Sequence, residues 1–377
     1  MKKLLVTGAA GFIGTNFVNY WRERKPKDII VALDSLTYAG NAINLEHLRH
    51  DPTFAFIEGD IRDQQLVTDL LKNYQIDTIV HFAAESHVDR SITGPDTFLE
   101  TNITGTHSLL KAAKQIWLDS NDRLDCHHFH HVSTDEVYGS LTDDGTPFCE
   151  TTPYAPNSPY AASKAASDHL VRAYNQTFGL KTTTSNCSNN YGPFQFPEKL
   201  LPLCILNILL GKSIPVYGDG QQIRDWLFVD DHNTAIDLVL SSGRHSETYN
   251  IGGNNEMRNL DVVKLLCSLL DSQFDSDETL KQRYPHSPCA QNNSAASLIS
   301  FVQDRPGHDV RYAVDASKIK STLKFVPSEA FATGLKKTID WYINNQSWWE
   351  NIKNGSYQKK DLTCKITPVT ETRDKSH

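Results

Sequence analysis

Short runs of apolar residues alternate with longer stretches of helical periodicity along the first half of the chain. The run KLLVT at 3–7 predicts a buried strand, and GAAGFIGTNFVNYWRER after it predicts a glycine turn that leads into an amphipathic helix. Strands separated by helices predict an α/β protein with a doubly wound parallel sheet. We expect further strands at 29–33, 54–57, 78–82, 128–132, 182–185, 214–216 and 248–251, and helices at 66–74, 99–117, 158–178 and 198–211.

The second half of the chain is less regular. After about residue 190, stretches rich in glycine, proline and asparagine, such as NNYGPFQFPEK, separate shorter elements and predict a smaller C-terminal lobe. The polar, weakly patterned segment 272–300 is expected to be a long surface loop. The expected parts are a sheet domain over 1–188 with a return segment near 222–252, a smaller lobe mainly over 189–345, and a polar tail over 346–377 that frays from about Asn354.

Composition narrows the classes of protein that such a fold could represent. No apolar run reaches the length of about 18 residues that a membrane span needs, and MKKLLVTGAAGFIG turns glycine-rich before a signal peptide could be completed, so we expect a cytoplasmic protein. The formal net charge of −8 disfavours nucleic acid as a partner, so an anionic ligand must be held by clustered Arg, Lys and helix N-termini. The seven cysteines include no C-x-x-C pair, which predicts reduced thiols.

A glycine motif directly after the first strand predicts a dinucleotide site. Gly8, Gly11 and Gly14 form G-x-x-G-x-x-G, which lets backbone N–H groups approach a pyrophosphate at a helix N-terminus. A tight strand-to-helix turn is the alternative, but Asp34 lies 20 residues after Gly14 at the end of the next strand, where a carboxylate accepts both adenosine ribose hydroxyls. That carboxylate repels a 2′-phosphate, so the pair predicts a Rossmann-type sheet that binds NAD rather than NADP.

Further cofactor contacts are expected close to this motif. Asp60 and Ile61, after the third strand, lie where an adenine edge could be recognised, although an Asp that caps the next helix explains the position nearly as well. The cofactor-binding residues expected from this part of the chain are Gly8, Gly11, Phe12, Ile13, Gly14, Asp34, Ser35, Leu36, Thr37, Asp60 and Ile61.

Tyr160 and Lys164 are four residues apart on a predicted helix and so share one face. A Lys ammonium, with a positive nicotinamide nearby, lowers the phenol pKa so that a tyrosinate can take a hydroxyl proton while hydride leaves carbon. An amphipathic helix with an incidental Tyr and Lys is the alternative. Upstream, HVSTDEVYG places Thr134 just past a predicted strand. With the glycine motif, this Thr/Tyr/Lys set resembles the triad of the short-chain dehydrogenase/reductase family, in its extended branch that modifies nucleotide sugars, and the resemblance implies that Thr134 donates to the oxygen being oxidised.

Asp135 and Glu136 distinguish this chain within that branch. Relatives that only oxidise or epimerise tend to carry small neutral residues here, whereas STDEVYG resembles the dTDP-glucose 4,6-dehydratases. Once C4 of the sugar is a ketone, the C5 proton is acidified, so Glu136 can abstract it while a protonated Asp135 delivers a proton to the departing C6 hydroxyl. Hydride returned to C6 then gives a 4-keto-6-deoxy sugar. A solvated or helix-capping acidic pair is the alternative.

The resemblance extends from residue 3 to about residue 345 in distinct motifs. They are DSLTYAGN at 34–41, HFAAESHVDRSI at 81–92, TNITGT at 101–106, NCSNNYGPFQFPEKLLP at 186–202, QQIRDWLFVDDH at 221–232, YNIGGNNEMRNLDVV at 249–263 and DRPGHDVRYAVDASKI at 304–319. One departure is Ser35, where many members carry Lys.

The family pattern implies further site residues. On the cofactor side they are Phe82, Ala83, Ala84, Ser86, Thr101 and Asn190, with Ser86 also near the hexose. For the nucleotide diphosphate, held mainly by the smaller substrate-binding lobe, they are Asn189, Lys199, Leu200, Pro215, Val216, Tyr217, Arg224, Asn259, Asp304, Arg305, Pro306, Gly307 and His308. Arg224 and Arg305 offer planar forks that suit a diphosphate, with a surface salt bridge as the alternative for each and for Lys199.

The expected partners are a nucleotide-sugar substrate and a second copy of the chain. The resemblance implies a homodimer through the helices at about 101–117 and 158–178. No metal is expected, because His127, His128, His130 and His131 lie on a strand whose alternate residues face opposite sides. The alternative functions are a nucleotide-sugar 4-epimerase, an NAD-sensing regulator of the same fold, and a dehydratase of UDP- or CDP-glucose.

Overall fold

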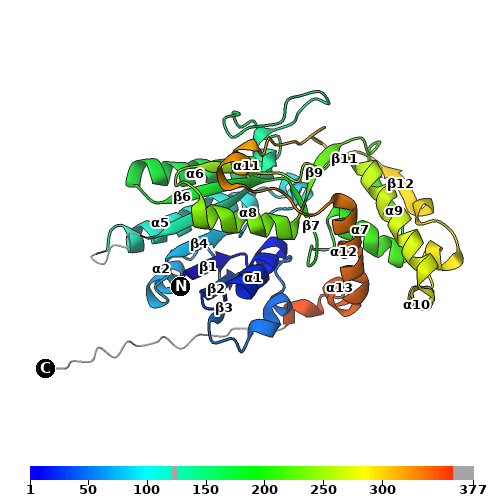
Figure 1. Ribbon diagram of the computed structural model, residues 1–377, viewed down its shortest axis with the longest axis horizontal. Helices are drawn as coiled ribbons and strands as arrows, with labels where there is room; N and C mark the ends of the chain where they lie inside the picture. The colour runs from blue at the N-terminus through cyan, green and yellow to red at the C-terminus, as the bar shows by residue number, and fades with distance from the viewer. Residues whose placement is uncertain (121–125, 360–377) are drawn as a thin grey trace.

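The computed structural model describes residues 1–120 and 126–359, and its centre is a seven-stranded parallel sheet (Figure 1). The strand order is β10-β6-β5-β4-β1-β2-β3, and every neighbouring pair is parallel. The bounds are β1 Lys3–Thr7, β2 Ile29–Asp34, β3 Phe54–Glu58, β4 Thr78–His81, β5 His128–Thr134, β6 Thr182–Cys187 and β10 Thr248–Ile251. The predicted doubly wound sheet is therefore confirmed.

Helices cover both faces of this sheet because its strands are apolar on both sides. Leu4 and Val6 of β1 pack with α1 and α8 on one face, while Leu5 between them packs with α2, α5 and α6 on the other. The bounds are α1 Phe12–Arg24, α2 Gln64–Asn73, α5 Thr106–Trp117, α6 Pro159–Phe178 and α8 Val229–Ser242. A shorter helical stretch lies before α5, where α3 Val88–Thr93 and α4 Asp96–Phe98 lead into a π-helix over Leu99–Gly105. The helix predicted at 99–117 thus begins with wider turns.

The second part of the chain is built on two small sheets around a core of its own. One sheet has the order β11-β9-β7 and the other pairs β12 with β8. The strands are β7 Asn189–Tyr191, β8 Ile214–Tyr217, β9 Ile223–Phe228, β11 Glu256–Arg258 and β12 Ile299–Val302, and the helices are α7 Leu200–Leu209, α9 Asn259–Ser276, α10 Glu278–Arg283, α11 Ser317–Leu323, α12 Phe331–Asn344 and α13 Gln346–Lys353. The predicted strand at 214–216 therefore lies outside the central sheet.

The prediction of a long surface loop over 272–300 was wrong. Helix α9 runs into this segment, α10 follows, and two 3₁₀ turns, Pro288–Gln291 and Ala295–Leu298, precede β12. Leu280, Tyr284 and Cys289 are buried against α9. Each short element contributes only one or two buried residues, so no window of the sequence shows a periodic pattern.

The prediction of a polar tail from residue 346 placed the start of the tail too early in the sequence. Residues 346–353 form α13, and a 3₁₀ turn at Ser356–Lys359 follows it. Trp348, Trp349 and Tyr357 are buried in the same core as α7 and α9. Two adjacent tryptophans supply enough apolar surface to anchor a short helix whose other side chains are polar. The remaining predicted tail, from residue 360, lies outside the described residues.

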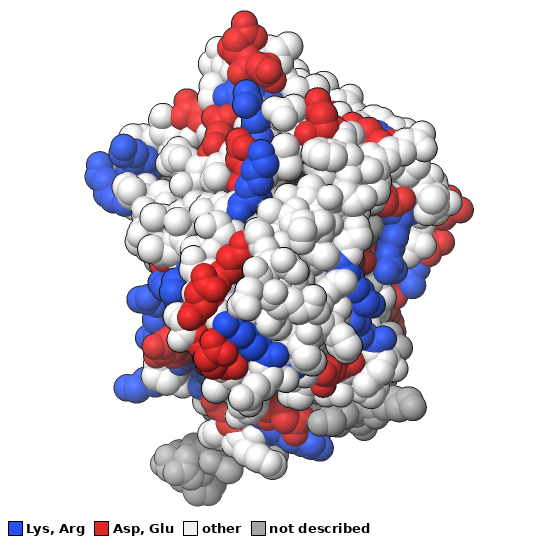
Figure 2. Space-filling model, turned by 90° about the vertical axis from the view of Figure 1, so that its right-hand side faces the viewer, with Lys and Arg blue, Asp and Glu red and all other residues white. Residues whose placement is uncertain are grey.

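The outer face that carries α9, α10 and β12 has positive and negative side chains interspersed among neutral ones (Figure 2). Among the described residues, no helix is both long and apolar enough to cross a lipid bilayer.

Candidate active site

Two glycines, one in the turn after β1 and one in the first turn of α1, leave no room for a side chain. Gly8 has φ +67°, and a Cβ atom there would lie 2.6 Å from the backbone nitrogen of Ala83. A Cβ atom at Gly14 would lie 2.1 Å from the carbonyl oxygen of Gly8. Gly11 and Phe12, at the start of α1, line a cavity, so the first N–H groups of this helix are available to an anion there.

Asp34 lies beside this turn because β2 is the neighbour of β1 in the sheet. Its Oδ2 accepts a hydrogen bond from the N–H of Ala10 at 2.9 Å, and its Oδ1 accepts one from the N–H of Leu36 at 2.9 Å. Burial raises the pKa of Asp34, and these two N–H groups oppose the rise. The carboxylate is thus fixed in direction at the cavity wall, where it can accept hydrogen bonds from vicinal hydroxyls of a ribose.

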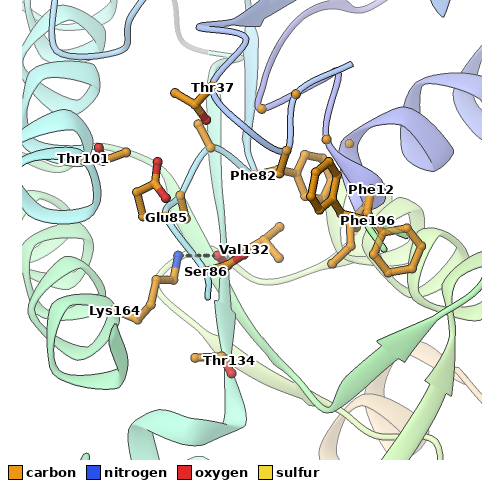
Figure 3. Close-up of a pocket in the computed structure, with 18 of the residues that line it drawn as sticks. Phe12, Thr37, Phe82, Glu85, Ser86, Thr101, Val132, Thr134, Lys164 and Phe196 are labelled. Atoms are coloured by element: carbon orange, nitrogen blue, oxygen red, sulfur yellow. Dashed lines mark hydrogen bonds between the residues drawn. The ribbon is translucent and has the colours of Figure 1, made fainter. Parts of the chain in front are cut away.

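The cavity, of about 510 Å³, joins the glycine turn to the end of β5. Figure 3 shows Phe12, Phe82 and Phe196 grouped on one side of it, with Glu85, Thr101 and Lys164 on the other. Leu36 does not line it; this residue donates its N–H to Asp34 while its side chain packs into the core beside α1. The predicted cofactor residues that do line it are Gly8, Gly11, Phe12, Ile13, Gly14, Asp34, Ser35, Thr37, Asp60, Ile61, Phe82, Ala83, Ala84, Ser86, Thr101, Tyr160, Lys164 and Asn190.

Asp60 is not a helix cap. The cap of α2 is Asp63, which accepts a hydrogen bond from the N–H of Leu66 at 3.0 Å. Asp60 instead pairs with Arg62 at 2.7 Å, and both residues line the cavity. Asp60 therefore lines the cavity as the partner of Arg62, and its contact with an adenine remains a prediction.

The five predicted catalytic residues all line the same cavity. Thr134 is the last residue of β5, and Asp135 and Glu136 begin the 3₁₀ turn that follows, in which the Thr134 hydroxyl accepts a hydrogen bond from the N–H of Glu136 at 3.3 Å. Tyr160 and Lys164 lie on the first turns of α6. Lys164 Nζ donates to the carbonyl oxygen of Val132 at 2.8 Å (Figure 3), which ties this helix to the end of β5.

The two neighbouring carboxyl groups have different surroundings. Asp135 is 2% exposed, its Oδ2 has no hydrogen-bond partner among the described residues, and burial together with Glu136 raises its pKa well above the ordinary value. Burial also raises the pKa of Glu136, but Arg305, Lys199 and Arg224 oppose that rise. The rise is larger for Asp135, so Asp135 holds a proton more readily than Glu136 does.

Lys164 alone does not produce the pKa lowering that we expected for Tyr160. Burial and the nearby Glu136 carboxyl raise the pKa of the Tyr160 phenol well above its ordinary value, while a hydrogen bond to Thr134 opposes them. The pKa of Lys164 is itself lowered by burial. Lys164 is directed to the carbonyl of Val132, and the lowering of the Tyr160 pKa by Lys164 together with a positive nicotinamide remains a prediction.

A buried polar network lies beneath the end of β5. Asp168, on α6, lies 3.0 Å from His131 Nε2 and accepts hydrogen bonds from the hydroxyls of Ser133 at 2.9 Å and Tyr154 at 3.0 Å. Burial raises the pKa of Asp168 to about 6, with Lys164 opposing the rise. The network joins α6 to the strand that carries Thr134, so it helps to fix the two catalytic elements to each other.

The strand histidines have structural partners. His128 Nε2 and His130 Nδ1 each lie 2.8 Å from the hydroxyl of Thr183, and His127 Nε2 accepts a hydrogen bond from the N–H of Lys181 at 3.1 Å. All four predicted histidines are buried. In the part of the chain that the structure describes, no group of three or more His, Cys, Asp or Glu side chains is arranged to hold a metal ion.

Several residues of the cavity wall were not among the predicted site residues. Glu198 lies 3.2 Å from Arg90 Nη2, and Glu85, Cys187 and Ser188 also line the cavity. Glu85 and Glu198 flank residues that the family motifs had already indicated, so inspection of those motifs could have found them. Cys187 ends the strand β6 and Ser188 follows it; both lie in the motif at 186–202, and the pairing of β6 with β5 places Cys187 opposite Thr134.

The predicted substrate residues divide into two groups. Ser86, Thr134, Asn189 and Lys199 line the cavity. The others do not line it; they lie on α7, on the two small sheets, at the start of α9 and on the loop after β12, and they are Leu200, Pro215, Val216, Tyr217, Arg224, Asn259, Asp304, Arg305, Pro306, Gly307 and His308.

Arg224 is a buried cation held by neutral groups. Its guanidinium donates to the carbonyl oxygens of Ile223 at 2.7 Å and Asp309 at 2.9 Å and lies over the ring of Tyr312. Among the described residues it forms no salt bridge, and Glu136 is one of the charges that raise its pKa against the lowering by burial. A buried cation without a paired carboxylate, close to Asp135 and Glu136, suits an anionic ligand.

Arg305 and Lys199 belong to the same positive region. Arg305 Nη1 lies 3.5 Å from Asp89, and its Nε is buried without a partner among the described residues. Lys199 Nζ donates to the carbonyl oxygen of Ser86 at 2.9 Å, and its pKa is lowered by burial against Glu198 and Glu136. The positive charge that an anionic ligand requires is therefore concentrated beside the cavity.

Comparisons with known proteins agree with this geometry. The model of the GDP-mannose 4,6 dehydratase family matches residues 5–338. The chain is 51% identical over 363 residues to the dTDP-glucose 4,6-dehydratase of Neisseria meningitidis serogroup B, a match that covers 96% of this chain and 99% of that protein. The chain belongs to the dTDP-glucose 4,6-dehydratase family. The likeness to this family spans the central sheet, the catalytic turn and the small sheets, so both halves of the site lie within it.

Solved structures separate the family from others that share the fold. The dTDP-glucose 4,6-dehydratase DesIV of Streptomyces venezuelae, solved with NAD bound, is 44% identical with a TM-score of 0.82 and covers 93% of this chain and 99% of its own. A UDP-glucose 4-epimerase of Thermotoga maritima is 25% identical with a TM-score of 0.76, covering 91% and 99%. The fold alone is thus common to dehydratases and epimerases, and sequence identity favours the dehydratase family.

Proposed function

We propose that the protein is an NAD-dependent dTDP-glucose 4,6-dehydratase that converts its substrate to dTDP-4-keto-6-deoxyglucose. The acid pair that follows Thr134 carries this proposal, because Asp135 and Glu136 share one cavity with the glycine turn and with Tyr160 and Lys164. An enzyme that only moved hydride at C4 would have no use for two further carboxyl groups of different proton affinity at that place.

The wall near the glycine turn fits NAD. The N-terminus of α1 is available to the pyrophosphate, Asp34 to a ribose, and a carboxylate at that position repels the additional phosphate of NADP. Bound NAD supplies the hydride acceptor for oxidation at C4 and the hydride donor for reduction at C6.

The chain's own residues handle the protons. Tyr160 takes the proton of the C4 hydroxyl, while Thr134 donates a hydrogen bond to the same oxygen. Glu136 removes the C5 proton, which the C4 ketone has made acidic, and Asp135 donates its proton to the C6 hydroxyl, which leaves as water. Glu136 then returns the proton to C5 when hydride is added at C6. Arg224, with its neighbouring cations, holds the diphosphate and so places the hexose at the end of β5.

Product analysis tests this function. The protein is incubated in turn with dTDP-, UDP- and CDP-glucose, and the 4-keto product is detected by its absorbance in alkali. We expect the chromophore with dTDP-glucose and little with the others. An inverted C4 hydroxyl without the chromophore would indicate an epimerase. Product from UDP- or CDP-glucose would show that the substrate carries another nucleotide base. No turnover with any of the three would favour the NAD-sensing regulator.

We also propose that the protein is a homodimer through α5 and α6. The two helices lie side by side on one flank of the molecule (Figure 1), and the outward side of α6 carries Ala162 and Ala173, small exposed side chains that permit close helix packing. Phe178, at the end of α6, is 45% exposed. A mass in solution equal to one chain would contradict this proposal.

We infer that the protein works in the cytoplasm. The six cysteines that the structure describes are all free thiols, as a reducing compartment favours. Cell fractionation would check this inference, and recovery of the protein outside the cytoplasm would contradict it.

A further inference from the structure

The C-terminal helix α13 contacts the cofactor end of the site from the far end of the chain. Trp348 Nε1 donates to Asn44 Oδ1 at 2.7 Å, across 304 residues of sequence. The hydroxyl of Tyr357, in the 3₁₀ turn after α13, donates to the carbonyl oxygen of Tyr38 at 2.5 Å, across 319 residues. Both contacts reach the segment 35–48, which connects β2 to β3 and includes residues that line the cavity.

The contact of Trp348 fixes the orientation of an amide. An indole N–H can only donate, so Asn44 must present its oxygen to Trp348 and its NH₂ group to the other side. On that side the NH₂ group donates to the carbonyl oxygen of Ala10 at 3.1 Å and to the hydroxyl of Thr15 at 3.3 Å. Ala10 belongs to the glycine turn, and its own N–H donates to Asp34. A short chain of hydrogen bonds thus connects α13 to the two groups that would hold the pyrophosphate and the ribose.

The contact of Tyr357 fixes the loop that closes the same end of the cavity. Tyr38 lies between Thr37 and Ala39, which line the cavity, and its ring contacts that of Phe196 with 5.6 Å between centroids. The ring of Tyr357 also contacts Phe196, at 6.4 Å. A loop held at its backbone carbonyl and at its aromatic side chain has less freedom to open.

We propose that Trp348 and Tyr357 are positioning residues that retain NAD by fixing the glycine turn and the loop over 35–41. The inference rests on the proposed function, in which the hydride taken from the sugar must be returned in the same turnover. An enzyme of this kind gains nothing from exchange of its cofactor, and loss of the reduced form would leave the reaction unfinished. A rigid adenosine end, held by a distant part of the chain, slows that loss.

Trp348→Phe and Tyr357→Phe test this role, with Trp349→Phe as the matched control. Trp349 is also buried in α13, and its indole N–H donates to the carbonyl oxygen of Tyr342 rather than to the segment 35–48. NAD is released with acid from each purified full-length protein and quantified, and its loss is followed after gel filtration below the melting temperature of every variant. The NAD concentration that gives half-maximal turnover of dTDP-glucose is measured in parallel.

We expect the two test variants to lose NAD about tenfold faster than the wild-type protein and to need about tenfold more NAD, because each leaves a buried acceptor without its donor. Trp349→Phe should retain NAD like the wild type, even if its melting temperature falls as far. Equal retention in all four proteins, or equal loss in the control, would overturn the proposal. A wild-type protein that retains NAD but does not convert dTDP-glucose would overturn the proposed function and leave this retention test intact.

Discussion

The division of labour between Asp135 and Glu136 can be tested with two isosteric substitutions. Asp135→Asn keeps the shape of the side chain but removes the proton that the acid would transfer. Glu136→Gln removes the base. The structure indicates that the first change conserves charge, because burial raises the pKa of Asp135 well above its ordinary value and favours the neutral acid in the wild type. We therefore expect the free energy of unfolding of Asp135→Asn to change by less than about 1 kcal/mol near neutral pH.

Each substitution should slow product formation by about 10²- to 10⁴-fold, the usual contribution of a general acid or base, which corresponds to about 3–5 kcal/mol of transition-state stabilisation. The step that fails should differ. In deuterated water, Glu136→Gln should oxidise C4, seen as absorbance of the reduced nicotinamide, but should not exchange the C5 hydrogen. Asp135→Asn should oxidise C4 and exchange C5 with the solvent, yet retain the C6 hydroxyl.

Mass spectrometry of the recovered nucleotide sugar measures the C5 exchange, and absorbance in alkali measures the keto product. Arg305, Lys199 and Arg224 oppose the rise in the pKa of Glu136 and are unchanged in Asp135→Asn, so the base should remain competent in that variant. The reasoning is refuted if Asp135→Asn abolishes C5 exchange as completely as Glu136→Gln does, or if either variant forms product at the wild-type rate.

Three further substitutions test other parts of the site. Gly14→Ala should destabilise the protein by about 1–3 kcal/mol in urea titrations and weaken NAD binding, because the added Cβ atom would lie 2.1 Å from the carbonyl oxygen of Gly8. The control Gly94→Ala should leave stability unchanged, because the nearest atom to its Cβ is a carbonyl oxygen at 3.9 Å. The folded state binds the proton of Asp168 more tightly than the unfolded chain does, since burial raises the pKa to about 6. The contribution of this group to the free energy of unfolding should therefore fall by about 3 kcal/mol as the pH rises from about 4 to about 6. Urea unfolding should show this fall in the wild type but not in Asp168→Asn, and identical pH slopes in the two proteins would contradict the prediction. Arg224→Lys should raise the KM for the nucleotide sugar about tenfold with a smaller change in kcat, and an unchanged KM in steady-state assays would exclude a diphosphate contact.

The sequence predicted the strands β1 to β4 well because they are buried and consist mostly of apolar residues. The run KLLVT is an example: Leu4 and Leu5 pack against opposite helix layers, so neither face needed a polar residue. Strand β9 was missed because IRDWLF places two charged residues among apolar ones. Arg224 and Asp225 are both buried there by neighbours that are distant in sequence, and a local pattern cannot show such burial.

The site could be predicted where its chemistry depends on spacing within one element or on adjacent strands. The glycine turn and Asp34 follow from two neighbouring strands, and Tyr160 with Lys164 from one helix. Contacts between distant segments could not be predicted, because they depend on how the second part of the chain packs. Trp348 is such a case: its bond to Asn44 crosses 304 residues and belongs to a segment expected to be a tail.

The different behaviour of two adjacent carboxyl groups follows from where the two parts of the chain meet. The strand β5 ends at Thr134, and Asp135 and Glu136 begin the 3₁₀ turn that follows it. Asp135 enters the buried wall built by the sheet, where its charged form is disfavoured. Burial raises the pKa of Glu136 as well, but Arg305, Lys199 and Arg224 from the second part of the chain oppose that rise. A sheet that carried only the hydride-transfer groups would lack this difference in proton affinity between two carboxyl groups. The elimination chemistry therefore requires the burial that the first part of the chain provides. It also requires the positive charge that the second part of the chain brings to the same edge of the sheet.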